Sequence, residues 1–147
     1  MKIFNRSATY DYTILDRFEA GVKLTGPEFK SVKGGHVSLT GSYVKMLGTE
    51  AYLINAKIEP YSFAKVENYD PQRTRKLLLH KREVMALKTK LDTTNLTLVP
   101  LSIYIHHGFV KVEIALAKGK KQFEKRETLK KRAETRELDR EFRGKVK

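Results

Sequence analysis

The chain has 147 residues, a length typical of one domain with one core. Its 30 lysines and arginines outnumber 17 aspartates and glutamates, and the net charge of +13 favours a polyanionic partner such as RNA, DNA or an anionic membrane. The absence of cysteine excludes disulfides, thiol nucleophiles and cysteine-ligated metals, and no apolar run reaches the length of a secretory signal or membrane span. We therefore expect a soluble cytoplasmic protein.

The first half of the chain shows short alternating segments separated by glycine. Residues 11–24 and 51–63 are rich in β-branched and aromatic side chains and predict strands, and residues 41–54 predict a hairpin that turns near Gly48. Residues 26–35 predict one short helix, since Pro27 suits a first turn, Glu28 favours a helix N-terminus, and Gly34 with Gly35 would end it. This helix interrupts an otherwise β region.

The second half begins with a break at residues 70–71, Asp-Pro. We predict a polar loop there, then a helix from about Leu78 to Leu91, and then a second hairpin over residues 95–117 that turns at Gly108. Pro100 would occupy an edge or bulge position. Because short strands outnumber the helices, the fold class is mainly β, a small closed or nearly closed antiparallel barrel comparable to an OB-fold.

The acidic residues and histidines give little reason to expect catalysis. None of the four histidines has a spacing that predicts a metal site, and no carboxylate cluster would hold a catalytic metal, so we expect neither metal nor cofactor. Early carboxylates such as Glu28 are expected to pair with surface lysines and arginines. Glu19 is the exception, because it breaks an apolar alternation, and a buried or half-buried glutamate needs a partner.

Two basic segments are candidates for contact with a polyanion. The loop at residues 70–77 carries Arg73, Arg75 and Lys76 and is a candidate phosphate clamp, although a solvated mobile loop is equally compatible with its composition. The other segment, residues 118–147, holds more than half of the net positive charge. We divide the chain into a barrel domain, 1–117, and this basic tail, 118–147.

The tail has helix propensity without a core. Its charged pairs at three- and four-residue spacing favour a helix, but its few apolar residues form no single stripe that could pack on the barrel. In isolation it should be disordered or fraying, and a partner would order it. A tail that only increases solubility is the alternative.

Several motifs in this order resemble the SmpB family, bacterial partners of tmRNA in the rescue of stalled ribosomes. The resemblance runs from residue 5 to residue 126 and is carried by "NRSATYDYTILDRFEAGVKLTGPEFKSVKGG", "DPQRTRKLLLHKRE" and "GFVKVEIALAKGKKQFEKR". It implies a six-stranded OB-like barrel with three helices and a basic, conditionally helical tail. It also implies a monomeric, non-enzymatic protein that binds the tRNA-like domain of tmRNA and brings it, with GTP-bound elongation factor Tu, to ribosomes that lack a codon.

The resemblance assigns roles by motif position. The tail would enter the empty mRNA channel of the small subunit. The tmRNA-facing residues would be Asn5, Arg6, Glu19, Leu78 and Lys111. The ribosome-facing residues would be Lys118, Gly119, Lys120, Lys121, Phe123, Lys125 and Arg126. The N-terminal motif departs from the family pattern, since Ser7 and Thr9 replace two expected cations and Tyr10 replaces a histidine.

Two alternatives to this function remain open at the level of the sequence. One is a ribosomal or initiation-factor-like OB protein that binds ribosomal RNA constitutively. The other is an RNA-processing enzyme, which would require turnover of RNA that Glu19→Gln abolishes without weakening binding.

Overall fold

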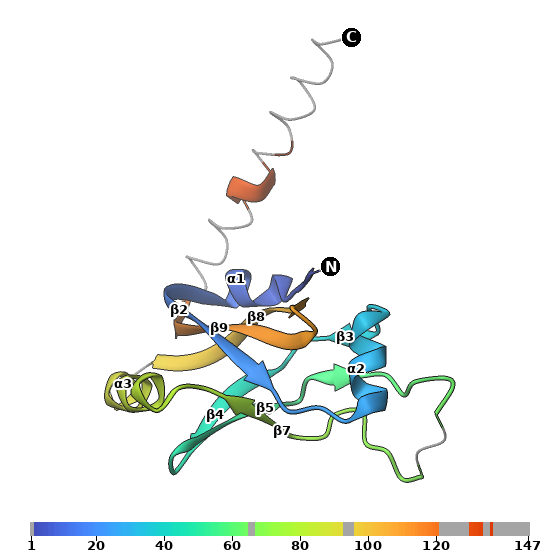
Figure 1. The fold of residues 1–147 in the computed structure, drawn as a ribbon. Helices are drawn as coiled ribbons and strands as arrows, with labels where there is room; N and C mark the ends of the chain where they lie inside the picture. The colour runs from blue at the N-terminus through green and yellow to red at the C-terminus, as the bar shows by residue number, and fades with distance from the viewer. Residues whose placement is uncertain (1, 65–66, 93–95, 121–129, 134–135, 137–147) are drawn as a thin grey trace.

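A computed structural model describes residues 2–64, 67–92, 96–120, 130–133 and 136 (Figure 1). The elements in chain order are β1 (Lys2–Phe4), α1 (Arg6–Asp11), β2 (Tyr12–Val22), α2 (Gly26–Lys33), β3 (Val37–Ser38), β4 (Tyr43–Leu47), β5 (Glu50–Ile54), β6 (Lys57–Ile58), β7 (Arg75–Leu78), α3 (Lys81–Leu91), β8 (Leu96–His106) and β9 (Phe109–Gly119). Residues 130–133 add a short helical stretch. In the described part of the chain, no helix is both long and apolar enough to cross a membrane.

Six antiparallel strands pair in a closed ring in the order β8, β4, β5, β7, β2, β9 and back to β8. Strand β1 extends the ring by pairing with β8, and β3 with β6 forms a separate two-stranded sheet. The contact between β4 and β8 is the shortest in the ring, with Val44 opposite Leu98 as its one described pair. The β8–β9 hairpin, by contrast, has the longest run of paired residues in the ring.

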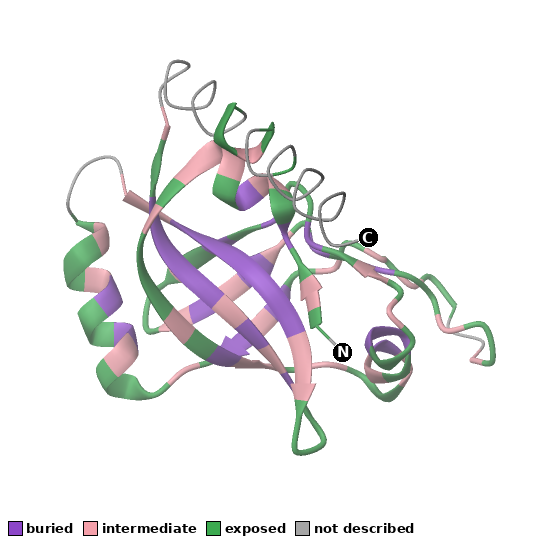
Figure 2. Cartoon of the chain, turned by 90° about the horizontal axis from the view of Figure 1, so that it is seen from above, coloured by how far each residue is buried: buried purple, intermediate pink, exposed green. Residues whose placement is uncertain are grey.

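The core fills the inside of the ring, and most of its buried residues lie on the strands (Figure 2). Helix α3 adds Leu87 to this core, and its Val84 is also buried, while its opposite face is exposed. A second apolar cluster lies between α1 and the strands, because Ala8 packs with Val99 and Ala115. The strands β8 and β9 are therefore covered on both faces over part of their length.

Several predicted elements are confirmed. Helix α2 begins with a capping box in which Glu28 N–H donates to Thr25 Oγ1 at 3.3 Å and Thr25 N–H donates to Glu28 Oε1 at 3.0 Å. It ends at Gly34, as predicted. Both hairpins turn at the predicted glycines, which have positive φ angles of 62° at Gly48 and 78° at Gly108. A register shift follows Pro100, at the predicted bulge position.

Two predictions are wrong, and two elements were not predicted. Residues 75–78 form strand β7 and not a loop or a helix start, because β7 pairs with β5 on one side and β2 on the other, and α3 begins only at Lys81. The strand expected over residues 51–63 breaks at Asn55, which has a φ of 65°. Helix α1 and strand β1 were not predicted from patterning, since both are short and gain stability by packing on β8.

Strand β9 crosses Ala117, the residue after which we divide the barrel domain from the basic tail. Strand β9 continues through Lys118 and Gly119, two residues past the predicted end of the domain, and these pair with Thr13 and Tyr12 of β2. Of the predicted ribosome-facing residues, Lys121, Phe123, Lys125 and Arg126 lie outside the described residues.

Candidate nucleic-acid interface

Three of the residues assigned to tmRNA lie together around one hollow. The hollow has a volume of about 400 Å³ and lies between the end of β2, the junction of β7 with α3, and the start of β9. Its wall contains Glu19, Leu78 and Lys111. We call it the Glu19–Lys111 hollow. The structure thus brings together three residues that are separated by up to 92 positions in the sequence.

Strand alternation explains why these side chains point outward. Their neighbours Ala20, Leu77 and Val112 are buried in the core of the ring. Successive side chains of a strand point to opposite faces. Glu19, Leu78 and Lys111 therefore share the outer face, where an RNA can reach them.

Gly21 lies at the centre of this arrangement, between Leu78 and Lys111. It lies directly opposite Leu78 of β7 and directly opposite Lys111 of β9, since β2 pairs with both strands. A Cβ atom at position 21 would lie 3.3 Å from Leu78 Cβ, which is tighter than ordinary packing allows. The missing side chain lets Leu78 lie over β2, and Leu78 remains 53% exposed as an apolar wall of the hollow.

Glu19 is exposed and has a hydrogen-bond partner. Tyr104 Oη donates a hydrogen bond to Glu19 Oε2 across the outer face of the sheet. Burial, followed by this hydrogen bond, raises the pKa of Tyr104 to about 12, so the phenol remains a neutral donor at physiological pH. The prediction that Glu19 needs a partner is confirmed, but the expectation that it is buried or half-buried is wrong.

The charged side chains that line the hollow are of both signs, with Lys111 as the cation and Glu19 and Glu83 as the carboxylates. Glu113, directly opposite Glu19, is paired with Arg17 at 3.1 Å. Among the described residues, Lys111 forms no ion pair with a carboxylate. An ammonium, two carboxylates, and the apolar side chains of Leu78 and Phe109 thus surround a space of nucleotide size. This combination can contact phosphate, accept a hydrogen bond and stack on a base.

Asn5 and Arg6, the two residues near the N-terminus that are assigned to tmRNA, lie in different environments. Asn5 is buried, its Nδ2 donates to the Pro100 carbonyl at 2.9 Å, and its backbone N–H donates to the Leu101 carbonyl at 2.7 Å. Ser7 Oγ donates to Asn5 Oδ1 at 2.8 Å, which gives a structural use to one departure from the family pattern. Asn5 thus fixes the start of α1, where Arg6 is exposed.

All three cations of the candidate phosphate clamp pair with carboxylates of the protein. Arg75 is fully buried, and its Nε and Nη2 donate to Glu28 Oε2 at 2.9 and 2.6 Å. Arg73 Nη2 donates to Glu28 Oε1 at 2.5 Å, and Lys76 pairs with Glu50 at 2.8 Å. Arg75 is therefore closed to an external phosphate, because its guanidinium is enclosed on all sides.

Glu28 is the one buried acid among the residues that the structure describes. Burial by itself would raise its pKa, but hydrogen bonds from the Thr25 N–H, Arg73 and Arg75 lower the pKa to about 2. Tyr69 Oη adds a contact of 3.2 Å to Glu28 Oε2. Glu28 pairs with cations as expected, but the pair with Arg75 is buried and not at the surface, because the first turn of α2 packs against Arg75.

The first residues of the ribosome-facing motif lie beside α1. Lys118 and Gly119 are exposed at the end of β9. Lys120 N–H donates to the Asp11 carbonyl at 2.9 Å, and Lys120 Nζ donates to the Thr9 carbonyl at 2.8 Å. Arg132 Nη2 donates to Thr9 Oγ1 at 2.5 Å. Thr9, another departure from the family pattern, thus anchors two cations of the basic segment.

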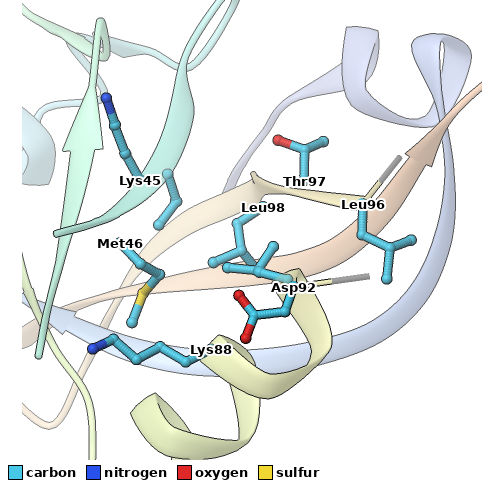
Figure 3. A pocket seen from close by; sticks show the side chains of 9 residues that line it. Lys45, Met46, Lys88, Asp92, Leu96, Thr97 and Leu98 are labelled. Atoms are coloured by element: carbon cyan, nitrogen blue, oxygen red, sulfur yellow. The ribbon is translucent and has the colours of Figure 1, made fainter. Parts of the chain in front are cut away.

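A larger hollow of about 520 Å³ lies at the weak junction of β4 with β8, under the end of α3. Leu98 and Met46 face into it, and the ammonium groups of Lys45 and Lys88 point away from the Asp92 carboxylate (Figure 3). None of the residues assigned to tmRNA lines it. The Glu19–Lys111 hollow is therefore the better candidate for RNA recognition.

Sequence reasoning missed Gly21 and the pairing of Tyr104 with Glu19. Tyr104 was one of several strand aromatics that could have been core or exposed, and its partner is 85 residues away. Only the register of β2, β9 and β8 brings the two side chains together. The one signal in the sequence was Glu19 itself, an acidic residue in an otherwise apolar alternation.

Comparison with known proteins agrees with these observations. The family model described as "SmpB protein" matches residues 2–144. The SsrA-binding protein of Lactobacillus delbrueckii subsp. bulgaricus is 48% identical over 139 residues, covering 95% of this chain and 91% of the relative. The SsrA-binding protein of a Sulfurihydrogenibium species is 48% identical over 143 residues, covering 97% and 94%.

A solved structure is also similar. It is described as "tmRNA-SmpB: a journey to the center of the bacterial ribosome", and the matching chain is 47% identical with a TM-score of 0.69. The match covers 82% of this chain and 85% of that one.

Proposed function

The chain belongs to the SmpB family, and from this membership we propose that it binds the tRNA-like domain of tmRNA and delivers it to stalled ribosomes for trans-translation. SmpB proteins are non-catalytic RNA-binding proteins, so the chain is not an enzyme. Its relatives bind SsrA RNA, which is tmRNA, and the similar solved structure concerns tmRNA and SmpB on the ribosome.

The observation that carries this proposal is the convergence of Glu19, Leu78 and Lys111 on one hollow. In the proposed complex, Lys111 contacts a phosphate, and Leu78 packs against a ribose or base. Glu19 accepts a hydrogen bond from a base amine or a ribose 2′-hydroxyl. A carboxylate beside a lysine supplies selectivity, because it repels phosphates and accepts only from a donor at one place.

The remaining roles follow from the family. We propose that Lys118, Gly119 and Lys120 begin a tail that enters the empty mRNA channel of the small subunit, with Lys121, Phe123, Lys125 and Arg126 continuing it. Contact with elongation factor Tu would be indirect, through tmRNA. The protein would act as a monomer in the cytoplasm, and its closed ring of six strands would correspond to an OB-like barrel.

A gel-shift titration with tmRNA and a bulk tRNA competitor tests the RNA assignment. Lys111→Ala should weaken tmRNA binding and reduce the log–log salt slope by about 0.7 to 0.9, the value for one lost phosphate contact. Lys45→Ala is the matched control, since Lys45 is an exposed strand lysine that lies outside the hollow. Equal affinity of the wild-type chain for tmRNA and bulk tRNA would contradict the proposal.

Truncation after Lys120 separates RNA binding from ribosome rescue. This position keeps the whole of β9, whereas truncation after Ala117 would remove the pairs of Lys118 and Gly119 with β2. The truncated chain should bind tmRNA nearly as well as the full chain and should fail to support tagging of stalled nascent chains. Loss of tmRNA affinity would show that tmRNA binding and ribosome rescue are not divided between the barrel and the tail. Stoichiometric retention on salt-washed ribosomes without tmRNA would instead support constitutive binding to ribosomal RNA.

A further inference from the structure

A separate hollow lies between the C-terminal end of α2 and the loop that follows β6. It has a volume of about 550 Å³, and its wall includes Lys30 of α2 together with His36, Tyr61 and Phe63. We call it the Lys30–Phe63 hollow. It shares no lining residue with the Glu19–Lys111 hollow. It is therefore a second concave surface built by different elements.

Main-chain hydrogen bonds hold this hollow in shape. His36 N–H donates to the Ser31 carbonyl at 2.9 Å, and Glu59 N–H donates to the His36 carbonyl at 3.0 Å. Ala64 N–H donates to the Tyr61 carbonyl at 3.0 Å and closes a turn with Phe63 near its tip. The short β3–β6 sheet links α2 to this loop. The side chains of Tyr61 and Phe63 are thus carried by a backbone that these hydrogen bonds hold in shape.

Phe63 is the most exposed large apolar side chain in the described part of the chain, at 87%. Its ring centroid lies 5.5 Å from that of Tyr61, with an angle of 62° between the planes. This edge-to-face pairing positions the Phe63 ring without covering it. An exposed, oriented ring next to a cavity offers a surface on which a nucleobase can stack.

The charges around this hollow favour an anion. Its one lining carboxylate, Glu59, is paired with Lys57 at 3.3 Å, so its negative charge is compensated. Lys30 forms no ion pair with any described carboxylate, and its ammonium adds positive charge to the wall. Ser31 Oγ, in the same wall, is buried and has no hydrogen-bond partner among the described residues, which is unusual for a hydroxyl.

We propose that the Lys30–Phe63 hollow binds an unpaired RNA nucleotide, whose base stacks on Phe63 and whose phosphate contacts Lys30. The combination of a stacking ring, a free cation and a nucleotide-sized space is that of a single-strand RNA site. The contact is additional to the Glu19–Lys111 hollow and can be tested with a short oligonucleotide. The unpaired nucleotide could come from tmRNA or from ribosomal RNA, and the experiment distinguishes these sources.

A single tryptophan provides the direct test, because the natural chain contains none. Phe63→Trp keeps a stacking ring and places the sole tryptophan at the site. Its emission should be quenched on titration with single-stranded octamers of uridine or adenosine. Leu47→Trp is the matched control, since Leu47 is an exposed apolar residue at the β4–β5 turn that lines neither hollow. Equal quenching in both variants would overturn the proposal.

Removal of the Phe63 ring then measures its contribution to RNA binding. Phe63→Ala should weaken binding of a fluorescein-labelled octamer about tenfold, the effect expected when one base–aromatic stack is lost. Lys30→Ala should weaken binding and reduce the log–log salt slope by about 0.7, the value for one phosphate contact to a single strand. Unchanged octamer affinity in Phe63→Ala would overturn the proposal, because an exposed side chain can be removed without unfolding the chain.

Binding of Phe63→Ala to the two natural RNAs identifies the source. Weaker binding to isolated tmRNA would assign the nucleotide to tmRNA, and weaker binding to ribosomes alone would assign it to ribosomal RNA. Wild-type affinity for both would overturn the inference. These results remain distinct from failure of the proposed function, which would appear as loss of selective tmRNA binding in the wild-type chain.

Discussion

Replacing Glu28 with glutamine removes the one negative charge that compensates the fully buried guanidinium of Arg75. Glutamine has nearly the same size and shape, so the substitution tests the charge and not the packing. The structure shows that Glu28 accepts hydrogen bonds from Arg75, Arg73, Tyr69 and the Thr25 N–H. We expect a large loss of stability at neutral pH, because a buried cation would lose its partner.

Two estimates of the magnitude agree. The folded-state pKa of Glu28 is about 2, against an ordinary value of 4.5. At about 1.4 kcal/mol per pH unit, that difference corresponds to about 3 kcal/mol of stability at pH 7. Removal of one partner from a buried ion pair costs about 3 to 5 kcal/mol in other proteins. We therefore expect Glu28→Gln to lower the free energy of unfolding by about 3 kcal/mol.

The loss should depend on pH in a defined direction. Because the folded-state pKa is lower than the unfolded one, the stabilisation is fully present above pH 4.5 and is lost as the pH falls towards 2. Protonated Glu28 resembles glutamine, so wild type and variant should become nearly equal in stability near pH 2. Urea unfolding followed by far-ultraviolet circular dichroism at pH 7, 4 and 2.5 measures this convergence.

An exposed pair provides the control. Glu50 and Lys76 are 2.8 Å apart, but their side chains are 43% and 40% exposed. Glu50→Gln should therefore cost much less stability than Glu28→Gln, because an exposed ion pair contributes little. The reasoning is refuted if Glu28→Gln costs no more than Glu50→Gln, or if the difference between Glu28→Gln and wild type is unchanged at pH 2.5.

Two further substitutions test the Glu19–Lys111 hollow. Gly21→Ala should weaken tmRNA binding in a gel shift and cost about 1 kcal/mol of stability, because the new Cβ crowds Leu78 at 3.3 Å. Gly26→Ala meets no atom within 4 Å and should bind normally, so equal binding by the two variants would argue against the role of Gly21. Tyr104→Phe removes the hydrogen bond to Glu19 and should cost about 1 kcal/mol in tmRNA binding free energy, and an unchanged affinity would show that Glu19 needs no positioning.

The two glutamates show where sequence reasoning succeeds and where it ends. Alternation indicated Glu19 as the unusual acid, and Glu28 was read as an ordinary helix-start residue at the surface. The structure reverses their burial, because the first turn of α2 packs on Arg75 while the outer face of β2 remains open. Local pattern determines which face of an element a residue occupies, but only the packing of elements determines which face is covered.

The local sequence determined the hairpins at Gly48 and Gly108, the start and end of α2, and the bulge at Pro100. These features depend on a few adjacent residues, since turns need positive φ angles and helix ends need capping groups. The charge of the chain and its resemblance to a family likewise come from the sequence alone.

The tertiary structure decided that residues 75–78 form a strand, that Arg75 is enclosed, and that Glu19 meets Tyr104. Each of these depends on pairing between strands distant in the chain, with Gly21 held between β7 and β9. Such pairing is a property of the closed ring as a whole, because the partner and register of each strand are set by all the others. No local pattern encodes which of two adjacent basic residues will be enclosed in the core and which will remain at the surface.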